Sequence, residues 1–287
     1  MNLNDVDACA RVTCINYDND KGDLLTCTDD GFIIQIPSSE GRISAWLACD
    51  ESAQRCTGWF HCSLIAETGM ILAISHAGNM ISIKQGSDLT LMNSICDFEG
   101  CVDSGITAAG WNTDQSSLLL VTGNDSLLAM THTLDVMQEV AIEPTIPGSP
   151  CALAWSGDGE YCCLYTVPIS DGTPRIKVYS KLLEPMGVAR AVMDGAAGVV
   201  KDLFPVVAIA PNGTLIASIQ KKNTSKFQVL LFERNGLRHG EFEIRIPEIN
   251  SDISFAREPT GVWFDISSTM LAVSFRPVTE GVITLIF

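Results

Sequence analysis

Apolar residues in this chain occur in short runs that are separated by turns of polar residues and glycine. One copy of the pattern begins at Trp111, passes through the polar turn 112–114, and continues with the apolar runs 118–122 and 127–131. Runs this short, rich in Ile, Val, Leu, Thr and Phe and bounded by turn residues, predict β-strands. Helical periodicity is nearly absent, so we expect an all-β protein.

The same unit of apolar residue, turn, run, turn and run recurs along the chain. Its key apolar positions are Ile65, Trp111, Trp155, Ile209 and Phe264, spaced 46, 44, 54 and 55 residues apart. A looser copy begins near Val12, which gives six recognisable copies. Repeats of roughly 40–50 residues built from short strands are typical of a β-propeller. We therefore predict one propeller domain over residues 1–287, with six recognisable blades.

Hairpin turns are predicted where Gly or Asn can adopt a positive φ. The segments concerned are 29–31, 76–79, 157–159, 211–213 and 234–236. The best helix candidate is 184–200, but Pro185, Gly187, Gly195 and Gly198 favour a loop there.

The negative charge lies in the first part of the chain. The net charge is −16, and residues 1–174 hold 5 Lys and Arg against 23 Asp and Glu. An acidic surface repels phosphate backbones, so this part is a poor nucleic-acid binder. The acids could meet a basic protein partner or simply keep the domain soluble, and the sequence leaves both open.

Cysteine usage and hydropathy indicate a reduced, intracellular protein. The eleven cysteines are odd in number, form no Cys-x-x-Cys pair and mostly lie inside apolar runs, so we expect neither disulfides nor a metal site. The longest apolar stretch, 203–220, is interrupted by the turn 211–213, so no membrane span is predicted. No secretory signal opens the chain, and the expected location is the cytoplasm, with the nucleus as a second compartment.

Three candidate sites each have a simpler explanation. Ser126, in the segment 123–128, faintly resembles an esterase serine block, but a hairpin turn explains it better. The basic cluster 221–239 fits a solvated strand edge better than a phosphate-binding patch. Four residues close in sequence could suggest metal binding, but their spacing matches no common ligand pattern: Cys56, His61, Cys62 and His76. We predict no catalytic, cofactor-binding or metal-binding residues, and no enzyme.

Two segments resemble a known family. The first runs from Ser104-Gly105-Ile106-Thr107 through Trp111-Asn112-Thr113-Asp114 to Thr122-Gly123, and the second covers 211–218 and 231–242. The most specific phrase is Phe232-Glu233-Arg234-Asn235-Gly236-Leu237-Arg238-His239-Gly240. These segments resemble the first WD40 propeller of the largest subunit of the Elongator complex, the IKAP family.

The resemblance implies a non-catalytic scaffold without a cofactor. In that family, two propellers and a C-terminal helical region that dimerises hold a catalytic radical-SAM/acetyltransferase subunit and a second propeller subunit. The assembled complex modifies the wobble uridine U34 of tRNA, and tRNA contact by this acidic domain itself is not implied. Within these 287 residues we expect neither the second propeller, nor the helical dimerisation region, nor the basic tRNA-contacting stretch, and Ile209 stands where the family's repeat commonly has Trp.

The family's first propeller has seven blades, so the resemblance implies an incomplete seven-bladed WD40-type propeller. Two alternatives remain open. One is a generic WD40 adaptor of another intracellular complex. The other is an enzyme of propeller fold, which would direct acids, histidines or metal ligands into one end of the central channel.

Overall fold

The computed structural model describes residues 12–17, 22–28, 32–36, 45–48, 58–84, 95–190, 203–223, 226–244, 258–276 and 283–286. Every regular element within these ranges is a β-strand, which confirms the all-β prediction. The chain divides into two compact units. Unit 1 contains residues 1–109 and 117–139, and unit 2 contains residues 110–116 and 140–287.

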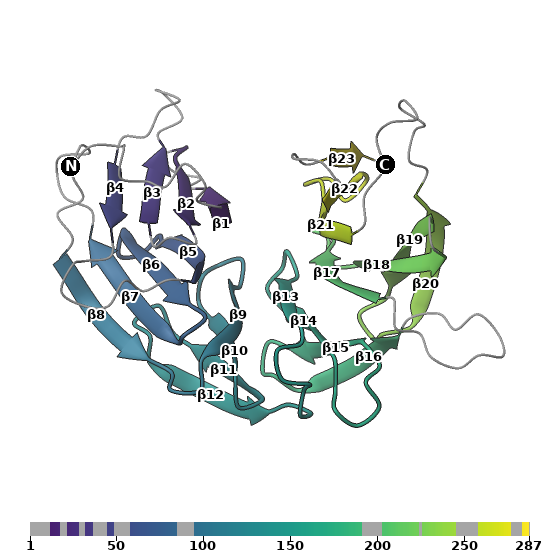
Figure 1. Cartoon of the computed structure of the whole chain (residues 1–287), viewed down its shortest axis with the longest axis horizontal. Coiled ribbons are helices and arrows are strands. Elements are labelled where there is room, and N and C mark those ends of the chain that lie inside the picture. The colour runs from purple at the N-terminus through teal and green to yellow at the C-terminus, as the bar shows by residue number, and fades with distance from the viewer. Residues whose placement is uncertain are drawn as a thin grey trace. The chain divides into compact units, whose positions relative to one another are not determined.

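Two antiparallel sheets of unit 1 each run strand to strand in chain order (Figure 1). The first contains β1 (Val12–Tyr17), β2 (Leu24–Thr28), β3 (Phe32–Ile36) and β4 (Ala45–Ala48). The second contains β5 (Trp59–Ile65), β6 (Met70–Ser75), β7 (Asn79–Lys84) and β8 (Ile95–Cys101). A third sheet, whose residues are shared between the two units, contains β9 (Ile106–Trp111), β10 (Leu118–Thr122), β11 (Ser126–Met130) and β12 (Val136–Ala141).

Unit 2 adds three sheets with the same order. The first contains β13 (Ala152–Trp155), β14 (Tyr161–Thr166), β15 (Arg175–Ser180) and β16 (Pro185–Arg190). The second contains β17 (Leu203–Ile209), β18 (Ile216–Asn223), β19 (Lys226–Phe232) and β20 (Arg238–Glu243). The last contains only β21 (Glu258–Phe264), β22 (Leu271–Arg276) and β23 (Ile283–Ile286).

The strand count corrects the predicted number of blades. The sequence predicts six recognisable blades, whereas the described strands form five four-stranded blades and a last sheet of only three strands. The pattern after Phe264 supplies only two further apolar runs, which become β22 and β23. No seventh sheet occurs among the described residues, so the seven-bladed expectation is not met there.

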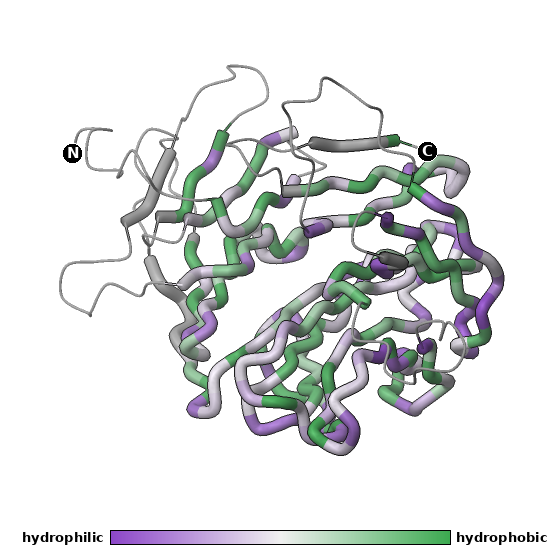
Figure 2. The backbone as a smooth tube through the Cα atoms, turned by 45° about the vertical axis from the view of Figure 1, so that its right-hand side comes forward, coloured by the Kyte–Doolittle hydropathy of each residue, from purple (hydrophilic) through white to green (hydrophobic). Residues whose placement is uncertain are grey.

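Burial explains why the apolar runs are nearly continuous in some strands and alternate with polar residues in others. Every residue of β10 and β14 is buried, whereas the residues of β12 and β20 alternate between exposed and half-buried. A central strand is covered on both faces, while the last strand of a sheet has water on one face. Figure 2 shows the result as apolar colour along the strands and polar colour at many turns.

Four of the five predicted hairpin turns contain a glycine with positive φ: Gly78, Gly159, Gly213 and Gly236. The fifth, 29–31, lies outside the described residues. The expected loop at 184–200 is wrong for its first part, because 185–190 forms β16. Pro185 is tolerated as the first residue of this strand, where the missing N–H is least disruptive. At Gly187 the backbone approaches Asn235 so closely that a Cβ would lie 2.0 Å from the Asn235 carbonyl oxygen.

Candidate functional site

In unit 2, the first hairpin turn of each sheet, or the strand residue directly after it, bonds to the equivalent turn of the next sheet. Thr113 Oγ1 donates a hydrogen bond to the carbonyl of Ser156 at 2.9 Å, and the Tyr161 hydroxyl donates to the carbonyl of Gly213 at 3.0 Å. The amide of Asn212 donates to Ser268 Oγ at 3.1 Å. We call the segments 112–116, 156–160, 211–214 and 265–269 the turn row. The polar turns that mark each repeat in the sequence therefore join neighbouring sheets.

Three turns of this row carry an aspartate that is held by its own turn. Hydrogen bonds from Ser116, Ser156 and Ser267 are the main cause that lowers the pKa of Asp114, Asp158 and Asp265, respectively, below the ordinary value. Carboxylates stabilised in this way stay ionised at neutral pH. Each aspartate accepts hydrogen bonds from its own turn. The turn row therefore presents negative charge, and these carboxylates do not form the pair of general acid and general base that a hydrolase would need.

Ser126, weighed above as an esterase-like serine and better explained by a hairpin turn, is the first residue of β11 and is buried. Its Oγ lies 2.8 Å from Thr122 Oγ1 and 3.2 Å from Asn124 Oδ1. A serine nucleophile needs a base such as histidine within hydrogen-bonding reach. Its hydrogen-bond partners Thr122 and Asn124 instead belong to its own hairpin, which fits the interpretation as a turn.

Among the residues weighed as metal ligands, the three that the structure describes do not come together. Cys56 lies outside the described residues. His61 and Cys62 are neighbours on β5, so their side chains point to opposite faces of the sheet. The ring of His76 stacks on Phe60, with centroids 4.2 Å apart, and its Nδ1 lies 3.1 Å from the carbonyl oxygen of Ile106.

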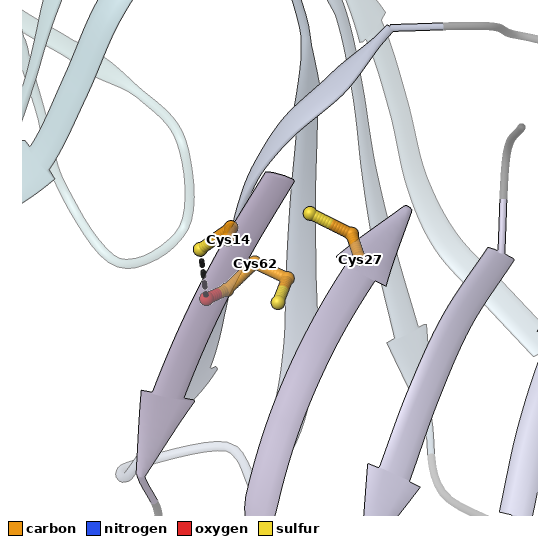
Figure 3. Close-up of side chains that lie close together, drawn as sticks. All are labelled: Cys14, Cys27 and Cys62. Carbon is orange, nitrogen blue, oxygen red and sulfur yellow. Dashed lines mark hydrogen bonds between the residues drawn. The ribbon is translucent and has the colours of Figure 1, made fainter. Parts of the chain in front are cut away.

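Cys62 belongs to a different group that the sequence spacing did not reveal. The Sγ atoms of Cys14 on β1, Cys27 on β2 and Cys62 on β5 all lie within 4.8 Å of one another (Figure 3). Cys14 and Cys27 are register partners in adjacent strands, whereas Cys62 comes from the neighbouring sheet. We call these three residues the thiol cluster. Only knowledge of strand register and sheet packing could have predicted it.

The thiol cluster lies in an apolar environment. Cys27 and Cys62 are fully buried and Cys14 is half-buried, among Leu25, Ile33 and other residues of one core. Hydrogen bonding from the Cys27 thiol is the largest cause that lowers the pKa of Cys14, and the same interactions with Cys14 raise the pKa of Cys27 and of Cys62.

Two cations of the basic cluster on β18–β20, Lys226 and Arg238, are paired with carboxylates of the same sheet. Lys226 Nζ lies 2.8 Å from Glu243 Oε1, Arg238 Nη2 lies 2.5 Å from Glu241 Oε2, and His239 Nδ1 lies 3.6 Å from Glu233 Oε1. The side chain of Lys222 lies outside the described residues. Paired cations are poor phosphate anchors because the carboxylates compete with a bound anion, so this geometry fits the solvated strand edge.

One face of the last sheet of unit 2 is exposed and apolar. Trp263, Ala272 and Ile286 are cross-strand partners and thus share a face, where Trp263 is 53% and Ile286 70% exposed. The opposite face, with Val262 and Val273, packs against the sheet β17–β20. In unit 1, the outer face of β1 and β2 similarly exposes Ile15, Tyr17 and Leu24. Grouped exposed apolar residues are typical of interaction surfaces.

No helix within the described residues is long and apolar enough to cross a membrane.

The sequence matches a family profile described as the first N-terminal β-propeller of ELP1, over residues 17–150 and 148–286. Elongator complex protein 1 of Schizosaccharomyces pombe is 25% identical over 222 residues, covering 61% of this chain and 16% of that protein. The Mus musculus protein of the same name is 28% identical over 184 residues, covering 50% and 13%. The Saccharomyces cerevisiae protein is 22% identical over 249 residues, covering 63% and 18%. The chain thus spans less than a fifth of the length of these relatives.

Among solved structures, the β-propeller domain of Cps50 (Swd1) from Myceliophteria thermophila matches with a TM-score of 0.65 at 13% identity, over 96% of this chain and 83% of that one. At this identity the likeness establishes the fold alone, and the fold is a β-propeller as predicted. The profile match covers both halves of the chain and agrees with the resemblance found in residues 104–123 and 211–242. The chain therefore belongs to the family of the first N-terminal β-propeller of ELP1, the largest Elongator subunit.

Proposed function

We propose that this chain is a non-catalytic scaffold module of an Elongator complex, which supports modification of the tRNA wobble uridine U34 through contacts with other proteins. The observation that carries the proposal is the family match over residues 17–150 and 148–286. Its WD40-type repeats form one propeller domain over residues 1–287. The domain works in the cytoplasm and also in the nucleus.

The proposed partners are the other subunits of the complex, above all the catalytic radical-SAM/acetyltransferase subunit and the second propeller subunit. Contact with tRNA belongs to the assembled complex. Two observations support this division: the turn row carries ionised aspartates, and the basic side chains of β19 and β20 are paired with carboxylates. Both features favour protein partners over a phosphate backbone.

The turn between β19 and β20 is the part of the surface we expect to matter most. Its backbone is fixed by the turn itself: the amide of Gly236 donates to the Glu233 carbonyl, and the amide of Leu237 donates to Asn235 Oδ1. Leu237, in contrast, is 64% exposed, so folding alone does not require leucine there. An exposed apolar residue within the most family-specific phrase of the sequence is a candidate contact for a partner protein.

The proposal is tested by expressing the tagged chain in eukaryotic cells and identifying the proteins that copurify by mass spectrometry. We expect endogenous Elongator subunits to be enriched over a tagged unrelated propeller. Enrichment of a different assembly would instead identify a generic WD40 adaptor, and recovery of no Elongator subunit would also contradict the proposal.

A pair of matched variants locates the contact. Leu237→Asp changes the family-specific turn, and Leu182→Asp changes the equivalent turn between β15 and β16, where the leucine is 65% exposed. We expect Leu237→Asp to reduce recovery of Elongator subunits several-fold while Leu182→Asp leaves it unchanged. Equal recovery with both variants would remove this turn as a contact and leave the scaffold proposal itself standing on the first experiment.

A further inference from the structure

The thiol cluster has the composition and spacing of a metal site rather than of three separate buried cysteines. Its three sulfur atoms come from three strands and two sheets, yet they all lie within 4.8 Å of one another. Cys14 and Cys62 are 48 residues apart in the sequence. Buried cysteines that serve only as small apolar residues have no reason to converge in this way.

We propose that Cys14, Cys27 and Cys62 bind one zinc ion, which links the first two sheets of unit 1. Zinc–sulfur bonds are about 2.3 Å long, so sulfurs around a tetrahedral zinc lie about 3.8 Å apart. The present spacing therefore needs only small side-chain adjustments to reach that geometry.

Charge and access favour zinc over a monovalent soft metal. Three thiolates around Zn²⁺ leave a net charge of −1, whereas three around Cu⁺ leave −2, and the higher charge is harder to accommodate in an apolar core. Cys14 is half-buried, so its side of the cluster gives solvent access for a water molecule as the fourth ligand. The proposed binding replaces three S–H bonds by three Zn–S bonds and releases the protons to solvent.

The surroundings also supply support for coordinated sulfur. Thr13 Oγ1 lies 3.3 Å from Cys27 Sγ and 2.5 Å from the carbonyl oxygen of Trp59, so its one hydroxyl hydrogen is shared between that carbonyl and the sulfur. Such outer groups orient ligands and stabilise their charge. His61 is not assigned as a ligand, because it points away from Cys62 on the same strand and its Nε2 lies 3.2 Å from Ser63 Oγ. The site is independent of the scaffold function proposed above.

The test titrates Zn²⁺ alone into the 287-residue chain, purified under reducing conditions and stripped with a chelator. Bound zinc is measured per chain after desalting, together with the thermal midpoint. We expect one zinc ion per chain and a higher midpoint when zinc is present. Co²⁺ in place of zinc gives a direct readout on the unaltered chain, because thiolate ligation produces intense sulfur-to-cobalt absorption. Absence of that absorption would overturn the proposal even if every variant failed to fold.

Variants separate the cluster from other cysteines. Cys14→Ser is the preferred change because Cys14 is half-buried and its replacement leaves the core intact, and Cys62→Ala removes a fully buried ligand. Each is expected to weaken zinc binding about tenfold or more. Cys162→Ala and Cys163→Ala are the matched controls, because both thiols are fully buried on β14 of unit 2 and should leave binding unchanged. Zinc binding that survives Cys14→Ser and Cys62→Ala, or binding below one ion per chain, would show three packing thiols and no site.

Discussion

Two interfaces between consecutive sheets of this molecule are packed with different kinds of side chain. In unit 1, the interface between the sheets β1–β4 and β5–β8 contains the thiol cluster, and we call it the thiol interface. In unit 2, the interface between the sheets β13–β16 and β17–β20 contains two buried tyrosines, Tyr161 and Tyr165, and we call it the tyrosine interface. Both join consecutive four-stranded sheets with the same strand order.

The tyrosine interface combines a large apolar body with a polar link. The hydroxyl of Tyr161 donates to the Gly213 carbonyl at 3.0 Å, and the hydroxyl of Tyr165 donates to the Leu203 carbonyl at 2.9 Å. Desolvation raises the pKa of Tyr161 and raises that of Tyr165 to about 12, so both remain neutral donors. Each ring therefore fills the space between sheets while its hydroxyl ties one sheet to the backbone of the next.

The thiol interface is joined through the backbone rather than through large polar side chains. Thr13 Oγ1 donates to the carbonyl of Trp59 at 2.5 Å, and Asn16 Nδ2 donates to the carbonyl of Cys62 at 3.3 Å. Its largest buried side chain, Trp59, makes no hydrogen bond to any described residue through its indole Nε1. A cysteine fills far less volume than a tyrosine and is only a weak hydrogen-bond donor. The contact from Cys14 Sγ to the carbonyl of Cys62 is 3.9 Å long. The repeated fold therefore determines which sheets are neighbours. The side chains at each interface determine how much that interface contributes to the free energy of unfolding.

The largest expected effect compares the two interfaces directly. Tyr161→Ala should lower the free energy of unfolding by about 3–5 kcal/mol, because it leaves a cavity and an unpaired Gly213 carbonyl. Cys62→Ala in zinc-free buffer should lower it by about 1 kcal/mol, because one small apolar group is lost. Urea titrations of the two variants measure both values.

A conservative variant separates the two parts of the tyrosine effect. Tyr161→Phe keeps the ring and removes only the hydroxyl, so we expect a loss of about 0.5–1.5 kcal/mol. Equal losses for Tyr161→Ala and Cys62→Ala would show that the two interfaces do not differ in strength.

The next effect concerns the close approach of two turns beside Tyr161. A Cβ at Gly157 would lie 2.1 Å from the carbonyl oxygen of Pro211, so Gly157→Ala forces the turns apart and should cost about 1–3 kcal/mol in unfolding free energy. Gly240→Ala is the matched control, because its Cβ would meet no atom within 4 Å. Thermal or urea unfolding of both variants gives the comparison. A neutral Gly157→Ala would mean that the turn row can shift without loss.

The repeat made most of the fold predictable from the sequence. The turn after Trp111 and the turns at 157–159 and 211–213 lie where the pattern placed them, because positive φ and strand alternation are local properties. The strand at 185–190 was missed because its proline and glycine are compatible with an outer strand whose backbone lies close to Asn235. That compatibility depends on a neighbouring sheet and leaves no local trace in the sequence.

The candidate sites were less predictable, because they also depend on contacts between sheets rather than on local sequence. Sequence spacing suggested Cys56, His61, Cys62 and His76, but neighbouring residues on a strand diverge and His76 bonds to the next sheet's backbone. The grouping of Cys14 with Cys27 follows from register, and the addition of Cys62 follows from packing between sheets. Neither relation appears as a fixed spacing along the chain.

The smallest expected effect is the pH dependence that the turn row adds to the tyrosine interface. Asp158 accepts hydrogen bonds from Ser156 Oγ at 2.5 Å and from the amide of Glu160 at 3.1 Å, and these bonds lower its pKa below the ordinary value of 3.8. A carboxyl group with a lowered pKa in the folded state stabilises the fold above its unfolded pKa, and this contribution disappears as the pH falls through the folded pKa.

Asp158→Asn keeps an acceptor but removes the charge. The unfolding free energy of this variant should therefore fall less steeply below about pH 3.8 than that of the unaltered chain.

Solvent screening keeps this effect small, because Asp158 is exposed, and we expect a difference below about 1 kcal/mol. Glu160→Gln is the matched control, since it removes one negative charge from the same turn without removing the bond between Ser156 and Asp158. Urea midpoints measured between neutral pH and the acid range give the slopes of all three proteins. If Asp158→Asn and Glu160→Gln gave the same slope, the turn would respond only to its net charge. A difference between them would show that the hydrogen-bonded carboxylate contributes specifically to the tyrosine interface, through the turn that carries Tyr161 against Gly213.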